Sequence, residues 1–185
     1  YIVVGTYWEG KGWIYLFNRD GEELWKWRAL GDVISVAISK DGSYIVAGDE
    51  KSYVYLLDRE GKLIWDIKLK DYGWFIHGVH VSISPNGSLI SIGISSKIAL
   101  IDKEGKWLLH PTDSAPVLGI SITDDGNFIF TANEEEGLKV YSRNGELVFT
   151  FKARERVYDI DNTPNGEYVV VGSDDMRVYL LKYKA

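Results

Sequence analysis

The sequence predicts an all-β fold built from repeated four-stranded units, and three observations lead to this prediction. An Asp-Gly or Asn-Gly turn recurs at intervals of 45, 39 and 40 residues, with its glycines at Gly42, Gly87, Gly126 and Gly166. A second turn recurs at intervals of 40, 44 and 40 residues, with its glycines at Gly21, Gly61, Gly105 and Gly145. The segments between turns are short and rich in β-branched and aromatic residues, and none has a sustained 3.6-residue period. Four antiparallel strands in roughly every 40 residues are typical of β-propeller blades, whereas a β-sandwich of about 18 strands would not explain the fixed repeat.

Each unit is expected to contain four strands, here called A to D. In the second unit they are predicted at residues 34–39, 44–48, 53–58 and 62–69. The Asp-Gly or Asn-Gly pair joins A to B, and it suits a two-residue hairpin turn in which both central residues take positive φ. The predicted blade units of this single domain are 1–31, 32–71, 78–113, 116–153 and 155–185.

The two ends of the chain leave incomplete units. Tyr1 aligns with the start of strand B and Ala185 with the end of strand C, so the first unit lacks strand A and the last lacks strand D. This gives about four and a half blades, against the 4 to 8 of most propellers. The chain is therefore expected to be an arc of a larger ring or an arc that another copy or chain completes, with an imperfectly closed five-bladed ring as the alternative. An open arc exposes strand edges and apolar blade faces.

Composition excludes several classes of function. Hydrophobic residues make up 45% and charged residues 26%, as in ordinary globular domains. The net charge of −6 argues against nucleic acid as a partner, and no apolar run reaches the length of a membrane span. The lack of cysteine removes disulfides, thiolate metal sites and cysteine nucleophiles, and it leaves the cellular compartment undetermined. The lack of Gln, the single Met and the plentiful Lys and Glu suggest a thermophilic source.

The C–D segments carry a spaced motif. Residues 55–65, YLLDREGKLIW, contain an Asp, a Gly three residues later and a Trp four residues after that, and residues 15–25 follow the same pattern with Asn for Asp. This resembles the tryptophan-docking motif of pyrroloquinoline-quinone-like propeller repeats. Residues 84–90, SPNGSLI, resemble the Ser-Pro-Asp-Gly turn of WD-repeat-like propellers. The resemblance spans the whole chain at the level of repeats and implies the propeller fold.

The chain departs from the tryptophan-docking motif and from the cofactor-binding members of that family. The Trp position holds Leu109 and Phe149 in later units. The resemblance implies a vicinal cysteine pair in the quinone-using dehydrogenases, and this chain has no cysteine. We therefore expect no cofactor and no cofactor-dependent catalysis.

Two loops are longer than the repeat requires. The interval from the C–D glycine to the next A–B glycine is 21 residues in three units but 26 from Gly61 to Gly87, and the extra residues fall around 71–77. Residues 6–12 lengthen the first B–C loop in the same way. Because B–C and D–A loops emerge on one face of a propeller, six candidate binding residues are expected to share that face: Tyr7, Trp8, Tyr72, Trp74, Phe75 and His77. Aromatic side chains with a polar handle are frequent anchors of binding sites. The alternative is that both loops pack over an exposed end of the arc.

The central channel supplies the second group of candidates. Strand A lines it, and alternate residues of this strand are small or polar except for three ionisable side chains, His80, Asp159 and Asp161. Two carboxylates on one strand face could bind a hard cation or act as an acid–base pair, but more ligands would be needed than are visible. The alternative is solvated channel lining, so no metal site and no catalytic residue is predicted.

These features predict a non-catalytic propeller scaffold that binds a protein or peptide through the aromatic loop face. A small-ligand or carbohydrate sensor module that uses the same aromatic residues is the first alternative. An enzyme with its site at the channel mouth, around His80 and Asp159, is the second. Self-association that completes the ring is expected as a further interaction.

Overall fold

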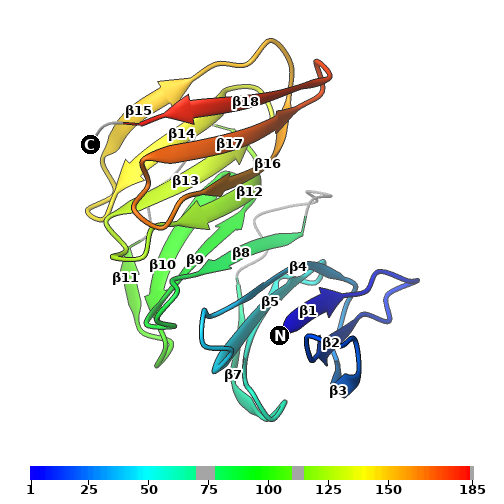
Figure 1. Ribbon diagram of the computed structural model, residues 1–185. Coiled ribbons are helices and arrows are strands. Elements are labelled where there is room, and N and C mark those ends of the chain that lie inside the picture. Colours follow the sequence, from blue (N-terminus) through cyan, green and yellow to red (C-terminus); the bar gives the residue numbers. More distant parts are fainter. Residues whose placement is uncertain (70–77, 110–114, 184–185) are drawn as a thin grey trace.

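The structure is a computed structural model that describes residues 1–69, 78–109 and 115–183 (Figure 1). These residues form 18 strands in five antiparallel sheets, each sheet ordered along the chain. The first sheet contains β1 (Ile2–Gly5), β2 (Trp13–Phe17) and β3 (Glu23–Arg28). The second contains β4 (Val33–Ile38), β5 (Tyr44–Asp49), β6 (Tyr53–Asp58) and β7 (Leu63–Lys68).

The remaining sheets continue the repeat. The third contains β8 (Val79–Ile83), β9 (Leu89–Ile94), β10 (Lys97–Asp102) and β11 (Trp107–Leu109). The fourth contains β12 (Val117–Ile122), β13 (Phe128–Asn133), β14 (Gly137–Ser142) and β15 (Leu147–Phe151). The fifth contains β16 (Val157–Asn162), β17 (Tyr168–Ser173) and β18 (Arg177–Lys182).

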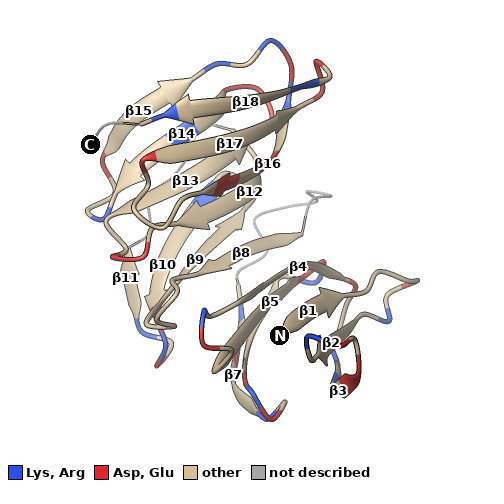
Figure 2. Cartoon of the chain, viewed as in Figure 1, with Lys and Arg blue, Asp and Glu red and all other residues tan. Residues whose placement is uncertain are grey.

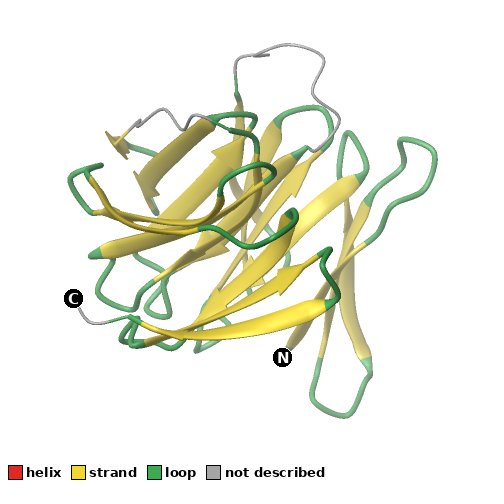
Figure 3. Ribbon diagram, turned by 90° about the horizontal axis from the view of Figure 1, so that it is seen from above, coloured by secondary structure: helices red, strands yellow, loops and turns green. Residues whose placement is uncertain are grey.

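Three four-stranded sheets are thus flanked by two three-stranded ones. The predicted all-β class and the predicted number of strands are confirmed, and the sheets have the form of propeller blades. The first sheet has strands B to D and the last has strands A to C, as the alignment of the repeats predicts. Many of the charged residues lie in the turns and at strand ends (Figure 2). A second view shows that the described residues are strands and loops, without a helix (Figure 3).

The A–B turns differ from the prediction. Gly42 has φ +71, and the other three turn glycines are alike, but the Asp or Asn before each of them does not have positive φ. The prediction of a two-residue hairpin turn is therefore wrong. The loop is longer: Gly42 N donates to Ser39 O at 2.8 Å and Ser39 N donates to Tyr44 O at 2.9 Å. Asp41 serves as an acceptor, taking hydrogen bonds from Ser39 Oγ at 2.8 Å and from Ser43 N at 3.0 Å.

This turn predicts an acid-sensitive contribution to stability. The Ser43 hydroxyl, the Ser43 N–H and the Ser39 hydroxyl lower the pKa of Asp41 from 3.8 to about 2. A carboxyl group with a lowered folded pKa stabilises the fold above its unfolded pKa, and this contribution is lost as pH falls from about 4 to about 2. In Asp41→Asn, the free energy of unfolding is expected to fall less steeply over this pH range than in the wild type, as measured by urea titrations at each pH.

Asn86 provides the matched control, because it holds the same place in the next blade and accepts from Ser84 Oγ at 2.8 Å and Ser88 N at 3.0 Å. Asn86→Asp places a titratable carboxyl group in this turn. The free energy of unfolding of this variant should therefore fall more steeply than that of the wild type as pH decreases. Equal slopes in all three proteins would contradict the assignment.

Each pair of neighbouring sheets encloses one cluster of buried apolar side chains. Between the first and second sheets, Ile14 and Leu16 pack with Ile45 and Leu57. Comparable clusters fill the three following junctions. The strands approach closely there: a Cβ on Gly48 would lie 2.3 Å from the carbonyl oxygen of Val79 in the next sheet. Neighbouring blades are therefore held together by a separate apolar cluster at each of the four junctions along the arc.

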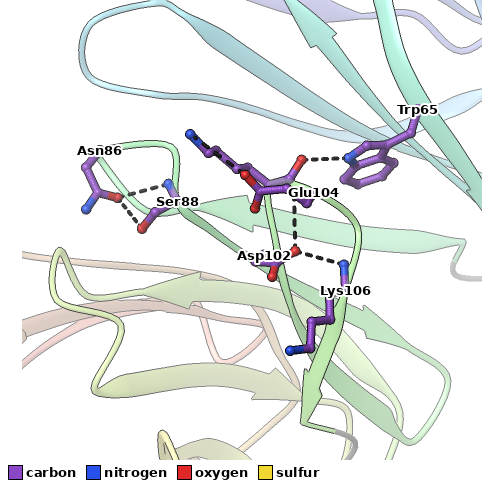
Figure 4. A network of polar contacts seen from close by, with 7 residues as sticks. Trp65, Asn86, Ser88, Asp102, Glu104 and Lys106 are labelled. Carbon is purple, nitrogen blue, oxygen red and sulfur yellow. Dashed lines mark hydrogen bonds and ion pairs between the residues drawn. The ribbon is translucent and has the colours of Figure 1, made fainter.

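Strand D of one blade also reaches the C–D turn of the next. Trp25 Nε1 donates to Arg59 O at 2.7 Å, and Trp65 Nε1 donates to Lys103 O at 2.8 Å (Figure 4). The latter turn is held by Asp102, whose carboxylate accepts the N–H groups of Glu104 and Lys106. These indoles fasten the outer rim of the arc.

Candidate functional site

The loop between β1 and β2, residues 6–12, presents the first two candidate residues; we call it the Tyr7–Trp8 loop. Its base is closed by Thr6 and Trp13, since Thr6 N donates to Trp13 O and Trp13 N donates to Thr6 Oγ1, both at 2.9 Å. At the tip, Lys11 N donates to Trp8 O at 3.0 Å, and Glu9 adopts a left-handed φ of +48. The loop therefore has a defined backbone conformation.

A buried carboxylate holds the tip of this loop. Asp32, directly before β4, accepts Trp8 N at its Oδ1 and Gly10 N at its Oδ2, each at 3.0 Å. Burial alone would raise the pKa of Asp32, but backbone N–H groups of the loop and the nearby Lys51 lower it below its ordinary value. The carboxylate is thus charged at neutral pH and fixes the backbone on both sides of Glu9.

The two aromatic side chains of the loop are exposed to solvent. Tyr7 is 72% exposed and Trp8 is 70% exposed, although both residue types usually bury most of their surface. Leu30, two residues before Asp32, is exposed as well. Gly12 N donates to Gly31 O at 3.2 Å, so the first B–C loop and the following D–A loop lie together. The exposed residues Tyr7, Trp8 and Leu30 therefore belong to two loops that lie side by side.

The other four aromatic-face candidates, Tyr72, Trp74, Phe75 and His77, lie outside the described residues. The shared face that they were expected to form with Tyr7 and Trp8 stays a prediction. Sequence reasoning missed Asp32 and Leu30. A signal for Asp32 existed in its place next to an inserted loop, but no spacing rule relates it to Trp8, which lies 24 residues earlier.

The three channel candidates lie together in the structure. A cavity of about 570 Å³ lies among the A strands β4, β8, β12 and β16, and His80, Asp159 and Asp161 line it. The other alternate positions of these strands also line the cavity: Ser35, Ala37, Ser82, Gly119 and Ser121. The intervening apolar residues Val36, Val81, Ile120 and Ile160 line the cavity as well, and the role of the channel residues stays a prediction.

The two carboxylates of the channel accept hydrogen bonds from nearby backbone N–H groups. Asp159 Oδ1 accepts Ile160 N at 2.9 Å, and Asp161 Oδ1 accepts Asn162 N at 2.8 Å. Ser35 bridges two blades, donating to Val81 O at 3.3 Å and accepting Val81 N at 3.1 Å. Over the described ranges, no three His, Asp or Glu side chains are grouped so that they could hold a metal ion. The polar groups that line the cavity are hydroxyls, two carboxylates and the His80 imidazole.

Comparison with known proteins places a family repeat at the C-terminal end. Residues 145–181 match the WD domain, G-beta repeat, and this stretch runs from the last C–D turn through β15, β16 and β17 into β18. The resemblance to WD repeats is therefore confirmed, but these comparisons support neither the pyrroloquinoline-quinone-like resemblance nor a thermophilic source. No curated protein matches the chain. Within its described residues, the chain holds no helix of the length and hydropathy needed to cross a membrane.

Proposed function

We propose that this chain is a non-catalytic interaction scaffold that binds a protein or peptide segment through the Tyr7–Trp8 loop. WD repeats are typically protein-interaction scaffolds, and one such repeat is present here. The observation that carries the choice of face is the exposed aromatic pair on a backbone held by the buried Asp32. Interface hot spots are rich in Trp and Tyr, and a preorganised loop loses little conformational freedom on binding.

The neighbouring side chains indicate the kind of partner. Leu30 is exposed on the adjoining loop segment, and Lys51 Nζ donates to Leu30 O at 2.7 Å, so a cation lies beside this apolar residue. Glu9 and Lys11 are exposed within the loop. An apolar or aromatic anchor side chain in a segment of mixed charge fits this arrangement, because interfaces combine an apolar centre with a polar rim.

The proposal is tested by selecting peptides from a displayed library against the 185-residue chain and measuring their affinities by calorimetry. Tyr7→Ala and Trp8→Ala are each expected to weaken binding by about tenfold or more, since hot-spot truncations cost about 2 kcal/mol. Asp32→Ala leaves both aromatic side chains in place but frees the loop, so it should weaken binding mainly through a less favourable entropy.

Trp107→Ala is the matched control, because Trp107 is also an exposed tryptophan but lies on β11 in the third sheet. It should bind the selected peptides as the wild type does. Peptides that bind Trp8→Ala and the wild type equally well would overturn the assignment of this face.

A further inference from the structure

The outer face of the fifth sheet is apolar and uncovered. The second and fourth residues of its strand C, Val178 and Leu180, are 75% and 70% exposed. The same two positions in the four preceding sheets are at most 1% exposed: Ile14, Leu16, Val54, Leu56, Ile98, Leu100, Leu138 and Val140. In those sheets the positions are covered by the blade that follows. The fifth sheet keeps the side chains of a blade junction without the second half of that junction.

The first sheet shows the opposite half. Ile2 and Val4 are 50% and 39% exposed, whereas the matching positions of strand B in the four following sheets are at most 1% exposed: Ile45, Ala47, Ile90, Ile92, Ile129, Thr131, Val169 and Val171. Ile2 pairs with Phe17 and Val4 pairs with Tyr15 across the strands, and the two rings stack at 6.0 Å. This end of the arc presents a four-residue apolar face.

The two faces are the two sides of one type of interface. At the junction of the first and second sheets, Ile14 and Leu16 pack with Ile45 and Ala47 of strand B and with Tyr55 and Leu57 of strand C. Val178 and Leu180 occupy the positions of the first pair, and the face of Ile2, Val4, Tyr15 and Phe17 occupies the positions of the other four. We propose that two copies of this chain associate head to tail, the fifth sheet of one copy packing on the first sheet of the other.

Contacts between a cationic side chain and a tyrosine ring at the blade junctions also support this packing. The Arg59 guanidinium lies 5.4 Å from the centre of the Tyr1 ring in the preceding blade, and Lys103 Nζ lies 5.9 Å from that of Tyr44. Tyr168 occupies the position of these tyrosines in the fifth sheet, and Arg19 occupies that of Arg59 in the first.

In a head-to-tail pair, Arg19 of the second copy lies over Tyr168. Within a single copy Lys182 lies 5.4 Å from that ring, so the ring already serves as a cation site. A stacked cation is worth most where it is desolvated, as it is at a blade junction.

The shape of the fifth sheet also suits a partner. A hollow of about 220 Å³ lies beside Tyr168, Val170 and Leu180. At the opposite end, a Cβ on Gly21 would meet nothing within 4 Å, whereas the equivalent atom on Gly61 would lie 2.8 Å from the docked Trp25 ring. The turn at Gly21 is therefore open, because within this chain no strand D of a preceding sheet lies against it.

The test uses one charged substitution on each face. Leu180→Asp disables the fifth-sheet face and Ile2→Asp disables the first-sheet face, and both side chains are at least half exposed, so both variants should fold, which circular dichroism checks. By light scattering, the wild type should exceed 21.0 kDa and grow with concentration, while each variant alone should remain at 21.0 kDa. An equimolar mixture should give a complex of twice the chain mass, because each variant keeps the face that the other lacks.

Other outcomes overturn the proposal. A wild type that stays monomeric at every concentration would show that a second copy does not cover these faces. Self-association of Ile2→Asp alone would indicate pairing of two fifth-sheet faces, and a mixture that stays monomeric would exclude head-to-tail packing. Val148→Asp, an exposed apolar position on β15, is the control and should behave as the wild type. Peptide binding by the Tyr7–Trp8 loop should persist in both variants, so failure of one proposal is distinct from failure of the other.

Discussion

Replacement of Asp49 by Ala is expected to destabilise the chain by about 3–5 kcal/mol, among the largest effects of a single substitution. Asp49 has no exposed surface, and its carboxylate accepts four hydrogen bonds. The donors are Gly31 N at 3.0 Å, Lys51 N at 2.9 Å, Tyr53 N at 2.8 Å and Tyr55 Oη at 2.7 Å. Removal of the carboxylate leaves all four donors without this acceptor, and two of them, Gly31 N and Tyr55 Oη, are buried. Urea unfolding followed by circular dichroism measures the loss.

Tyr55→Phe is the graded control for this prediction. The Tyr55 hydroxyl donates to Asp49 and accepts Leu30 N at 3.1 Å, and burial, with the adjacent carboxylate, raises the pKa of this phenol well above its usual value. It therefore remains a donor at neutral pH. Its removal is expected to cost about 1–2 kcal/mol, because one hydroxyl with two partners is lost. If Asp49→Ala cost no more than Tyr55→Phe, the carboxylate would not be the centre of the network.

The second large effect is expected at a junction between blades. Leu56 is fully buried between the second and third sheets, so Leu56→Ala should lower the free energy of unfolding by about 2–5 kcal/mol through lost burial and a residual cavity. Leu180 has the same position in the repeat but is 70% exposed, and Leu180→Ala should change stability by less than about 0.5 kcal/mol. Both are measured by urea unfolding in solutions dilute enough to keep copies apart. Equal losses would mean that the fifth-sheet face is already covered within one chain.

The repeat spacing predicted the strands well because turns and alternating apolar residues are local features of the sequence. Strand C of the second unit was predicted at 53–58 and is observed at Tyr53–Asp58, and strand A begins one residue earlier than predicted, at Val33. For the A–B turn, the predicted role of the Asp or Asn residue was wrong. Asp-Gly and Asn-Gly were assigned to positive φ at both residues, but Asp41 is retained as an acceptor for the hydroxyl and amide groups around it.

The candidate residues were found from the repeat and from departures from it. The three channel candidates line one cavity, and Tyr7 and Trp8 are exposed on the inserted loop, but the roles assigned to them stay predictions. Asp32 and Asp49 were not found in this way, because a single acidic residue at a strand end has no periodic signal. The donors to Asp32 lie 22 and 24 residues earlier in the chain, and one of the four donors to Asp49, Gly31 N, lies 18 residues earlier, so local sequence does not indicate these contacts.

The docking of Trp25 and Trp65 onto the next blade bears on how the number of blades can change during evolution. Each indole bonds to a turn carbonyl, of Arg59 or Lys103, at the same repeat position. Duplication of one gene segment of about 40 codons would add a blade whose two sides already match its neighbours, since stacked repeats contact only adjacent units. Deletion of one segment would likewise join two compatible sides. Segments that carry this Trp and this turn are therefore the ones whose duplication or deletion keeps the contact, while a substitution within one such turn affects two blades at once.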